Sequence, residues 1–318
     1  MLNRKVVIIG DGMVGSTTAY TLMLNNYISE IVIIDVNKSK AEGDALDMIH
    51  GMPFVSPKIV KAGDYKDIVD AHIVIITAGV GQKDGETRID LLKRNLKVFD
   101  SIIESMKPFV HKELIVMVVT NPVDVLTYYT YSKLDLPSNQ VIGSGTVLDT
   151  ARLKAAIAED AHVDSRNIHT FVLGEHGDSE VPAFSVTTIG GLSLDKFCQR
   201  CGRCKGKHLS RLNELHNKVK NAAYEIIAKK GATYYAVALA VARIVEAIIN
   251  NTNSVLTVST LIEDESEFGI KDFYFSLPCI VNSKGIERVL RLDYSLEEKE
   301  SLIASGKKIR DLIIEVNN

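Results

Sequence analysis

A glycine-rich turn near the N-terminus constrains the fold more than any other feature of this chain. Residues 6–9 form a continuous apolar run, and glycines follow it at positions 10, 12 and 15. Gly10 permits a tight turn, Gly12 lets a pyrophosphate approach the backbone, and Gly15 allows close helix–strand packing. The next helix would direct its N–H groups and its positive dipole end at the phosphates. The pattern therefore predicts a strand–turn–helix unit that binds a dinucleotide.

An acidic residue at the end of the next apolar run supports this interpretation. Asp35 lies about 20 residues after Gly15, the spacing at which a carboxylate accepts hydrogen bonds from the adenosine ribose. The carboxylate would repel a 2′-phosphate, and no arginine follows it directly, so the sequence favours NAD over NADP. The alternative is a strand–turn–helix unit without a cofactor.

Apolar runs of this kind recur through the first half of the chain. They cover residues 6–9, 31–34, 73–76 and 114–119, with segments between them that are long enough for crossover helices. Short continuous apolar runs are typical of strands buried on both faces of a parallel sheet. The clearest helix is expected at 86–106. The first half therefore predicts a Rossmann-type, doubly wound α/β sheet with its ligand crevice at the carboxyl ends of the strands.

The second half predicts a different, α+β arrangement. We expect a helix near 145–159, a strand near 168–173, a helix at 209–227, antiparallel strands at 254–262 and 272–290 with a turn at 282–285, and an amphipathic helix at 295–316. We place the boundary near Gly143-Ser144-Gly145. Residues 1–143 would then bind the dinucleotide, and residues 144–318 would form the substrate-binding domain.

Composition narrows the functional class. The chain has 318 residues, 46% hydrophobic content and a net charge of −3, which gives no reason to expect a nucleic acid or an anionic membrane as partner. The first residues show no signal peptide, and no apolar run reaches the ~18 residues of a membrane span. Four cysteines are too few for a disulfide scaffold. We therefore expect a cytoplasmic protein.

Two further segments carry residue types suited to catalysis. Residues 79–88 contain three glycines and end in Arg88, which suits a lid that closes over a substrate; a flexible surface loop is the alternative. Asp149 and Arg152 would share one helix face, where the arginine could grip a carboxylate. A carboxylate beside His176 would raise the pKa of the imidazole and fix its tautomer. A surface ion pair and a solvated histidine are the alternatives.

At this point the chain resembles the bacterial L-lactate dehydrogenases of the lactate/malate dehydrogenase family, from about residue 5 to 315. The matching motifs are Gly10 to Gly15, Ile34-Asp35, Ala78-Gly79 through Arg88, Thr120-Asn121-Pro122-Val123-Asp124, Gly143 through Arg152, Gly174 through Asp178, and Gly231-Ala232-Thr233-Tyr234. The resemblance implies NAD as cofactor and a reversible hydride transfer between NADH and pyruvate, giving (S)-lactate, as the fermentative end step of glycolysis.

The resemblance also implies roles for single residues. His176 would donate or accept the proton, Asp149 would stabilise its charged form, and Arg152 would bind the substrate carboxylate. Arg88 would polarise the carbonyl as the lid closes. The remaining substrate positions would be Gln82, Asn121 and Thr233. The positions that match cofactor contacts are Gly10, Gly12, Met13, Val14, Gly15, Asp35, Lys40, Tyr65, Gly79, Val80, Ser101, Asn121 and Ser144.

Gln82 separates the two main activities of this family. In malate dehydrogenases the matching lid position resembles an arginine site that pairs with the second carboxylate of oxaloacetate. Glutamine cannot neutralise that charge, so a buried dicarboxylate would be left with an uncompensated anion. Lactate dehydrogenase is therefore favoured over malate dehydrogenase. The sequence also leaves open a branched 2-hydroxy-acid dehydrogenase and a non-catalytic NAD-binding protein.

Assembly and regulation follow only from the resemblance. It implies a homotetramer, and in many bacterial members an allosteric site for fructose 1,6-bisphosphate at a subunit interface, formed by a basic residue and a histidine. His169 matches the histidine, and Lys154 stands where activated members generally have arginine. Lysine keeps the charge but loses the bidentate geometry, so activation stays open, and His169 could simply pack in a strand.

A cysteine cluster departs from the common family pattern. Cys198, Cys201, Cys204 and His208 have a spacing that could bind zinc or an iron–sulfur cluster. The segment is basic and lacks a second ligand pair. We therefore expect a reduced surface loop and no metal.

Overall fold

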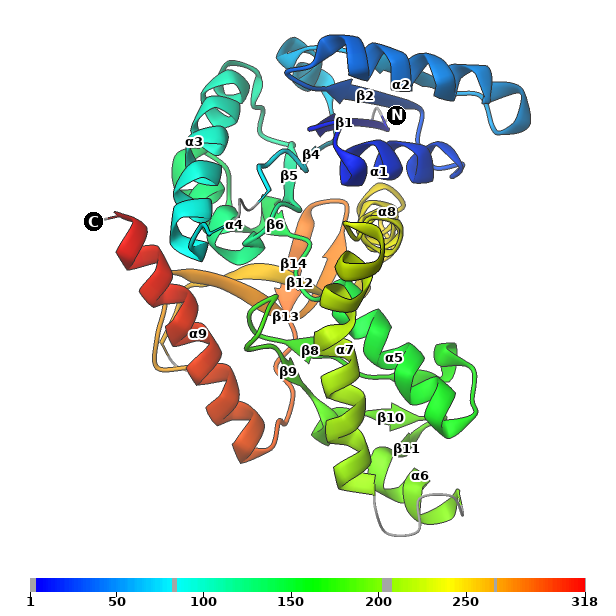
Figure 1. Ribbon diagram of the computed structural model, residues 1–318, viewed down its shortest axis with the longest axis vertical. Helices are drawn as coiled ribbons and strands as arrows, with labels where there is room; N and C mark the ends of the chain where they lie inside the picture. Colours follow the sequence, from blue (N-terminus) through cyan, green and yellow to red (C-terminus); the bar gives the residue numbers. More distant parts are fainter. Residues whose placement is uncertain (1–3, 82–84, 202–207, 266–267, 318) are drawn as a thin grey trace.

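A single nine-stranded sheet runs through the computed structural model, which describes residues 4–81, 85–201, 208–265 and 268–317. The strand order is β14-β13-β12-β6-β5-β4-β1-β2-β3 (Figure 1). The parallel part consists of β1 (Lys5–Ile9), β2 (Glu30–Ile34), β3 (Ile59–Ala62), β4 (Ile73–Ile76), β5 (Ile115–Val118) and β6 (Val141–Gly143). The predicted doubly wound Rossmann-type arrangement is confirmed.

The apolar runs become strands because helices cover both faces of the sheet. Every residue of β1, β4 and β5 is buried. The covering helices of this half are α1 (Met13–Met23), α2 (Lys38–His50), α3 (Arg88–Met106) and α4 (Val123–Lys133). Helix α1 packs against α8 (Tyr235–Ile249), whereas α3 packs against α4 and α9 (Leu296–Asn317). The carboxyl ends of the parallel strands are left for the loops that carry the site.

The antiparallel strands of the second half extend the same sheet. Strand β12 (Ser254–Ile262) pairs with β6 through Ser259 and Gly143, and with β13 (Phe273–Asn282) along its whole length. Strand β14 (Gly285–Val289) completes the predicted hairpin. The sheet is thus continuous across the position at which the sequence predicts a domain boundary.

The predicted strand at 168–173 is wrong as a single element. The structure has β7 (Ile168–His169) in a three-stranded sheet and β8 (Val172–Leu173) in a two-stranded sheet with β9 (Val181–Pro182). Between the two strands the chain changes partner, and the buried Thr170 hydroxyl bonds that of Thr187 at 2.7 Å. Continuous apolarity alone does not reveal such a change of partner.

The outer part of the second half has its own apolar cluster. Helices α5 (Val147–Ala161) and α7 (His208–Lys230) pack together there, beside α6 (Leu194–Arg200) and the small strands β10 (Thr188–Ile189) and β11 (Leu192–Ser193) (Figure 1). Leu153, Ile157, Leu212, Leu215 and Val219 are buried in it. Among the described residues, no helix is both long and apolar enough to span a membrane.

Candidate functional site

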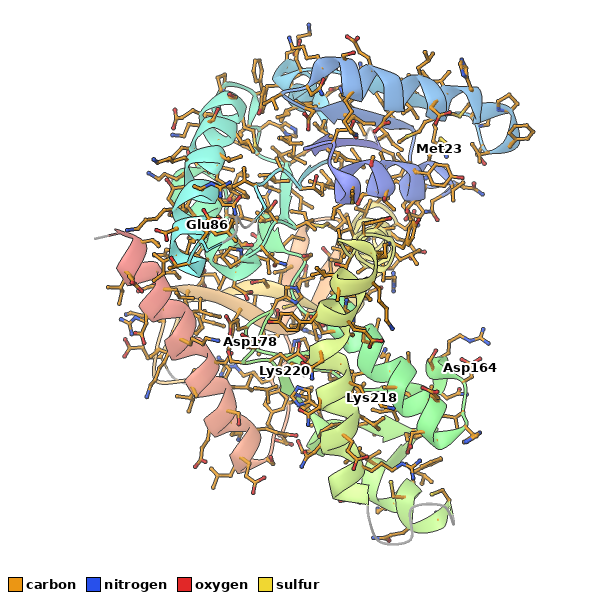
Figure 2. The ribbon with its side chains drawn as sticks, in the orientation of Figure 1. Met23, Glu86, Asp164, Asp178, Lys218 and Lys220 are labelled. Atoms are coloured by element: carbon orange, nitrogen blue, oxygen red, sulfur yellow. The ribbon has the colours of Figure 1, made fainter. Side chains whose placement is uncertain are left out.

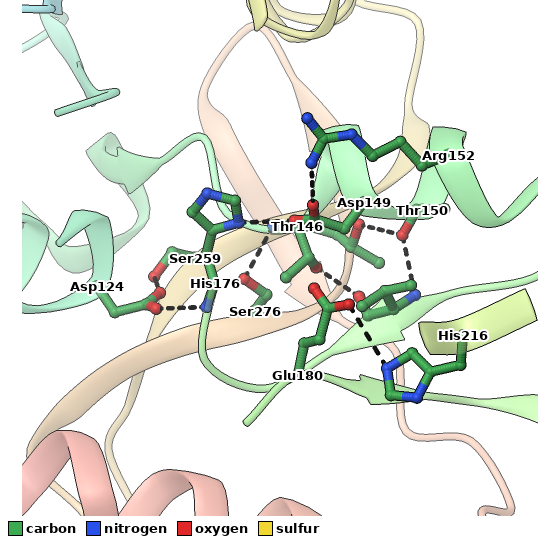
Figure 3. A network of polar contacts seen from close by, with 12 residues as sticks. Asp124, Thr146, Asp149, Thr150, Arg152, His176, Glu180, His216, Ser259 and Ser276 are labelled. Carbon is green, nitrogen blue, oxygen red and sulfur yellow. Dashed lines mark hydrogen bonds and ion pairs between the residues drawn. The ribbon is translucent and has the colours of Figure 1, made fainter. Parts of the chain in front are cut away.

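One buried carboxylate holds the two residues that dominate the site. Asp149 lies in the first turn of α5, Arg152 one turn later, and His176 in the loop after β8. One oxygen of Asp149 lies 2.6 Å from Nδ1 of His176, and the other accepts a hydrogen bond from Nη1 of Arg152 at 2.9 Å (Figure 3). The Asp149 side chain is only 4% exposed, so both of its oxygens are paired where water is scarce.

This arrangement favours a charged imidazole. Burial opposes the charge on His176, but the Asp149 carboxylate outweighs it and raises the pKa of His176 to about 9. Burial likewise opposes the charge on Asp149, but the charges and hydrogen bonds of His176 and Arg152 hold the pKa of Asp149 below its usual value. Near neutral pH the site therefore combines an imidazolium, which can give up a proton, with a guanidinium beside it.

Asp124 is a residue that the sequence analysis did not assign to the site. Its carboxylate accepts the backbone N–H of His176 at 2.8 Å and the Ser259 hydroxyl at 2.5 Å. Asp124 is buried at the start of α4, and this burial raises its pKa to about 6 although both hydrogen bonds oppose the shift. It fixes the loop that carries the imidazole. Its position at the end of the motif 120–124 was the one sequence feature that could have indicated this role.

A cavity of about 140 Å³ brings four of the predicted site residues together. Asn121, Arg152, His176 and Thr233 all line it, although they come from four separate segments. The rest of its wall is Val119, Ser144, Gly145, Leu148, Ala223, Ile227, Val237 and Ala240. One cation, one ionisable ring and a mostly apolar wall suit a small monoanion whose other end is apolar.

The glycine turn has the geometry of a phosphate cradle. Gly10 has a φ of +105°, and a Cβ there would overlap the backbone of Ala78. A Cβ on Gly15 would overlap the carbonyl oxygen of Gly10, whereas one on Gly12 would meet no protein atom within 4 Å. Gly12 is also the N-cap of α1 and provides no side-chain cap. The first N–H groups of α1 therefore face open space, as binding of a dinucleotide phosphate requires.

Asp35 lies next to this cradle, as predicted. Its oxygens accept the backbone N–H of Asp11 at 2.6 Å and that of Asn37 at 2.8 Å. Lys40, in the first turn of α2, forms an ion pair with the Asp11 carboxylate at 3.0 Å. Tyr65 is half-buried, which raises its pKa, and the charge of Asp35 raises it further. The structure thus brings Asp35, Lys40 and Tyr65 to one end of the cradle.

The remaining cofactor positions lie on several elements of the first half of the chain and at the start of the second half. Gly79 packs closely on Thr120, and the N–H of Val80 donates to the buried Asn95 at 2.9 Å. Met13 is exposed at the start of α1 and Val14 is half-buried there, Ser101 is exposed on α3, and Ser144 lines the cavity.

The proposed lid is only partly described. Gln82 lies outside the described residues, and Arg88 begins α3, but its side chain is outside the described part. A capping box between Thr87 and Asp90 starts that helix. Glu86, labelled beside α3 in Figure 2, holds Arg94 through hydrogen bonds of 2.6 and 2.8 Å. The far end of the segment is thereby tied to α3.

The two residues of the expected allosteric site lie on different elements of this chain, Lys154 on α5 and His169 on β7. Lys154 is half-buried on α5, and its pKa is lowered by burial and then by the charge of Arg243. His169 is exposed on β7, paired in register with Thr188. Between the described side chains of Lys154 and His169 there is no hydrogen bond or ion pair.

The cysteine cluster shows no metal geometry in the described part of the chain. Cys198 and Cys201 lie at the end of α6, whereas Cys204 and the His208 side chain lie outside the described residues. Among the residues that are described, no group of three or more His, Cys, Asp or Glu could hold a metal ion.

Comparisons with known proteins agree with this geometry. Residues 4–143 match the family model "lactate/malate dehydrogenase, NAD binding domain", and residues 146–318 match "lactate/malate dehydrogenase, alpha/beta C-terminal domain". An L-lactate dehydrogenase of Acetivibrio thermocellus is 53% identical over 98% of this chain and 96% of its own length. L-lactate dehydrogenase 1 of Clostridium acetobutylicum is 49% identical over 97% of each chain.

Solved structures give the same result. A lactate dehydrogenase from a Medee basin deep-sea metagenome library superposes with a TM-score of 0.94 at 40% identity, over 100% of both chains. The minor L-lactate dehydrogenase of Enterococcus mundtii, in a ligand-bound form, superposes with a TM-score of 0.93 at 40% identity, over 99% of both chains.

Proposed function

Because this chain belongs to the lactate/malate dehydrogenase family, we propose that it is an NAD-dependent L-lactate dehydrogenase that interconverts pyruvate and (S)-lactate. The observation that carries the proposal is the shared cavity, in which Arg152 and His176 face the same small volume. The full-length similarity to L-lactate dehydrogenases supports the same activity.

Arg152, His176 and Asp149 have different roles in the proposed reaction. Arg152 binds the substrate carboxylate through two parallel N–H bonds, while its third contact, to Asp149, fixes the plane of the guanidinium. His176 gives its proton to the keto oxygen as that oxygen becomes negative. Asp149 stabilises the imidazolium and holds it through Nδ1, so the proton is transferred from Nε2. In lactate oxidation the neutral imidazole takes the proton back.

The glycine cradle and Asp35 hold the cofactor, and NADH, when bound, supplies the hydride that reduces the keto carbon. Arg88 arrives with the lid and stabilises the developing negative charge. Gln82 and the apolar wall select a methyl group over a second carboxylate, because neither neutralises an anion. Asn121 and Thr233 orient the substrate beside the nicotinamide.

Identification of the product tests this proposal. Purified protein should oxidise NADH when pyruvate is added, and chiral chromatography should identify the product as (S)-lactate. A His176→Asn variant is the matched control, because it keeps the cavity but removes the proton donor. Absence of lactate with the unmodified protein, or a faster reaction with oxaloacetate or a branched 2-keto acid, would contradict the proposal.

The proposal extends to organisation and regulation. We place the division between cofactor and substrate domains at residues 143–144, which the limits of the two family models support. We propose a homotetramer that acts in the cytoplasm at the fermentative end of glycolysis. Exposed apolar side chains support self-association, namely Leu46, Ile49, Tyr224, Ile227, Tyr235 and Leu239. Light scattering should give the mass of four chains.

Activation by fructose 1,6-bisphosphate forms part of the same proposal. The proximity of Lys154 to Arg243 supports it, because two cations suit a phosphate. Activity measured with and without the bisphosphate, in the unmodified protein and in Lys154→Gln, tests it. An identical response of both proteins would contradict a role for Lys154.

A further inference from the structure

Asp11, within the glycine turn, buries its carboxylate against Lys40, a contact that dinucleotide binding alone does not require. Its side chain is fully buried, and Oδ1 makes no hydrogen bond to any described residue. Oδ2 lies 3.0 Å from the ammonium of Lys40, which also donates to the backbone oxygen of Asp11. Burying a carboxylate without full hydrogen bonding is unfavourable, so its presence calls for a physical explanation.

Asp11 connects Lys40 to the carboxylate that would contact the ribose. Asp35 accepts the backbone N–H of Asp11 at 2.6 Å, and Lys40 contacts the side chain of that same Asp11. A cation at this end of the fold is what NADP-binding proteins use for the 2′-phosphate. A lysine here would thus be expected to favour NADPH over NADH.

Two carboxylates prevent Lys40 from attracting the 2′-phosphate of NADPH. Its ammonium lies 3.0 Å from Asp11 and 2.7 Å from Asp44, one turn further along α2. The two negative charges exceed the single positive charge, so the group as a whole repels an anion. The Asp11 carboxylate is buried, whereas that of Asp44 is 36% exposed and more strongly screened.

We propose that Asp11 determines the preference for NADH over NADPH by holding Lys40 away from the 2′-phosphate. This inference rests on the proposed NAD-dependent activity and adds a specificity residue to the Asp35 carboxylate. Lys38, also in the first turn of α2, is exposed and has no described ion pair. It provides an internal comparison.

The test compares binding and turnover of the two dinucleotides. Fluorescence titration gives the Kd of NADH and of NADPH, and steady-state rates with pyruvate give kcat/KM for each. In Asp11→Asn the NADPH/NADH ratio of kcat/KM should rise about tenfold, with a matching fall in the Kd of NADPH, because one like charge is removed and Lys40 is released. Asp11→Ala should shift the ratio in the same direction.

Matched variants identify the cause of the shift. Asp47→Asn removes an equal charge from an exposed position on the same helix and should leave the ratio unchanged. In the Asp11→Asn background, Lys40→Gln should abolish the gain, whereas Lys38→Gln should preserve it. An unchanged ratio in both Asp11 variants, loss of binding of both dinucleotides, or a gain that survives Lys40→Gln would overturn the inference. Lack of pyruvate-dependent turnover in the unmodified protein would instead contradict the proposed function, and the Kd values would still test Asp11.

Discussion

Nδ1 of His176 lies 2.6 Å from the carboxylate of Asp149, and this contact sets the protonation of the site. Burial opposes the charge on the imidazole, but the Asp149 charge outweighs burial and raises the pKa of His176 to about 9. Pyruvate reduction needs the charged imidazole, so its rate should persist up to about pH 9 and fall above that value. Lactate oxidation needs the neutral ring and should rise over the same range.

Asp149→Asn should lower the pKa of His176. Without the carboxylate charge, burial still lowers the pKa of His176, and only the weaker charges of Asp124 and Glu180 oppose it. The upper limit of pyruvate reduction should therefore move to lower pH, and kcat/KM at pH 7 should fall by about 10²–10⁴-fold. The pH profile of kcat/KM measures both effects. A lower rate with an unshifted profile would show that Asp149 only supports the structure.

Arg152→Lys should weaken substrate binding while it preserves the charge. Lysine cannot form two parallel N–H bonds to a carboxylate. We expect kcat/KM for pyruvate to fall about 10–100-fold, the effect of losing one charged hydrogen bond. Arg166→Lys is the control, because Arg166 is exposed and paired with Asp164. Equal effects of the two substitutions would contradict the assigned role.

Gln82→Arg should shift the substrate preference toward oxaloacetate. The new cation would pair with the second carboxylate, which the present lid leaves uncompensated. The ratio of kcat/KM for oxaloacetate to that for pyruvate should rise about 100-fold or more. Steady-state assays with both keto acids measure it. If the ratio stays constant, Gln82 does not contact the substrate.

Gly12→Ala and Gly15→Ala should separate cofactor binding from folding. A Cβ on Gly12 meets no protein atom within 4 Å, so the melting temperature should not change, whereas NADH binding should weaken about tenfold or more because the methyl group occupies the cradle. A Cβ on Gly15 would overlap the carbonyl oxygen of Gly10, so this variant should lose stability by about 1–3 kcal/mol. Thermal melts and NADH titrations distinguish the two. Normal NADH affinity in Gly12→Ala would exclude the cradle.

The sequence predicted four of the six parallel strands, β1, β2, β4 and β5, because each contains a short apolar run buried on both faces. It did not predict β3, which is partly exposed and contains Lys61, or β6, which has only three residues. The helices α3, α7 and α9 were also predicted, from their apolar stripes. Helix α8 was not predicted. Its sequence is apolar at most positions, and the exposed Leu239 lies on the same helix as the buried Val241 and Ile244. Burial of a helix between two neighbours is a tertiary property that periodicity does not show.

The sequence predicted some residues of the candidate site but not others. Asp149, Arg152 and His176 carry chemistry in their residue types and lie in recognisable motifs. The role of Asp124 depends on a backbone hydrogen bond across 52 positions, and that of Asp11 on its contact with Lys40. Neither contact leaves a local pattern in the sequence, because each one joins two elements that only the fold brings together.

Binding of oxamate, a pyruvate analogue with an amino group in place of the methyl group, tests the shared cavity most directly. Its Kd for the NADH complex should be measured in the unmodified protein, Arg152→Lys and His176→Asn. If both side chains hold one molecule, both substitutions should weaken oxamate binding about tenfold or more while NADH affinity stays the same. Unchanged oxamate affinity in either variant would contradict the account.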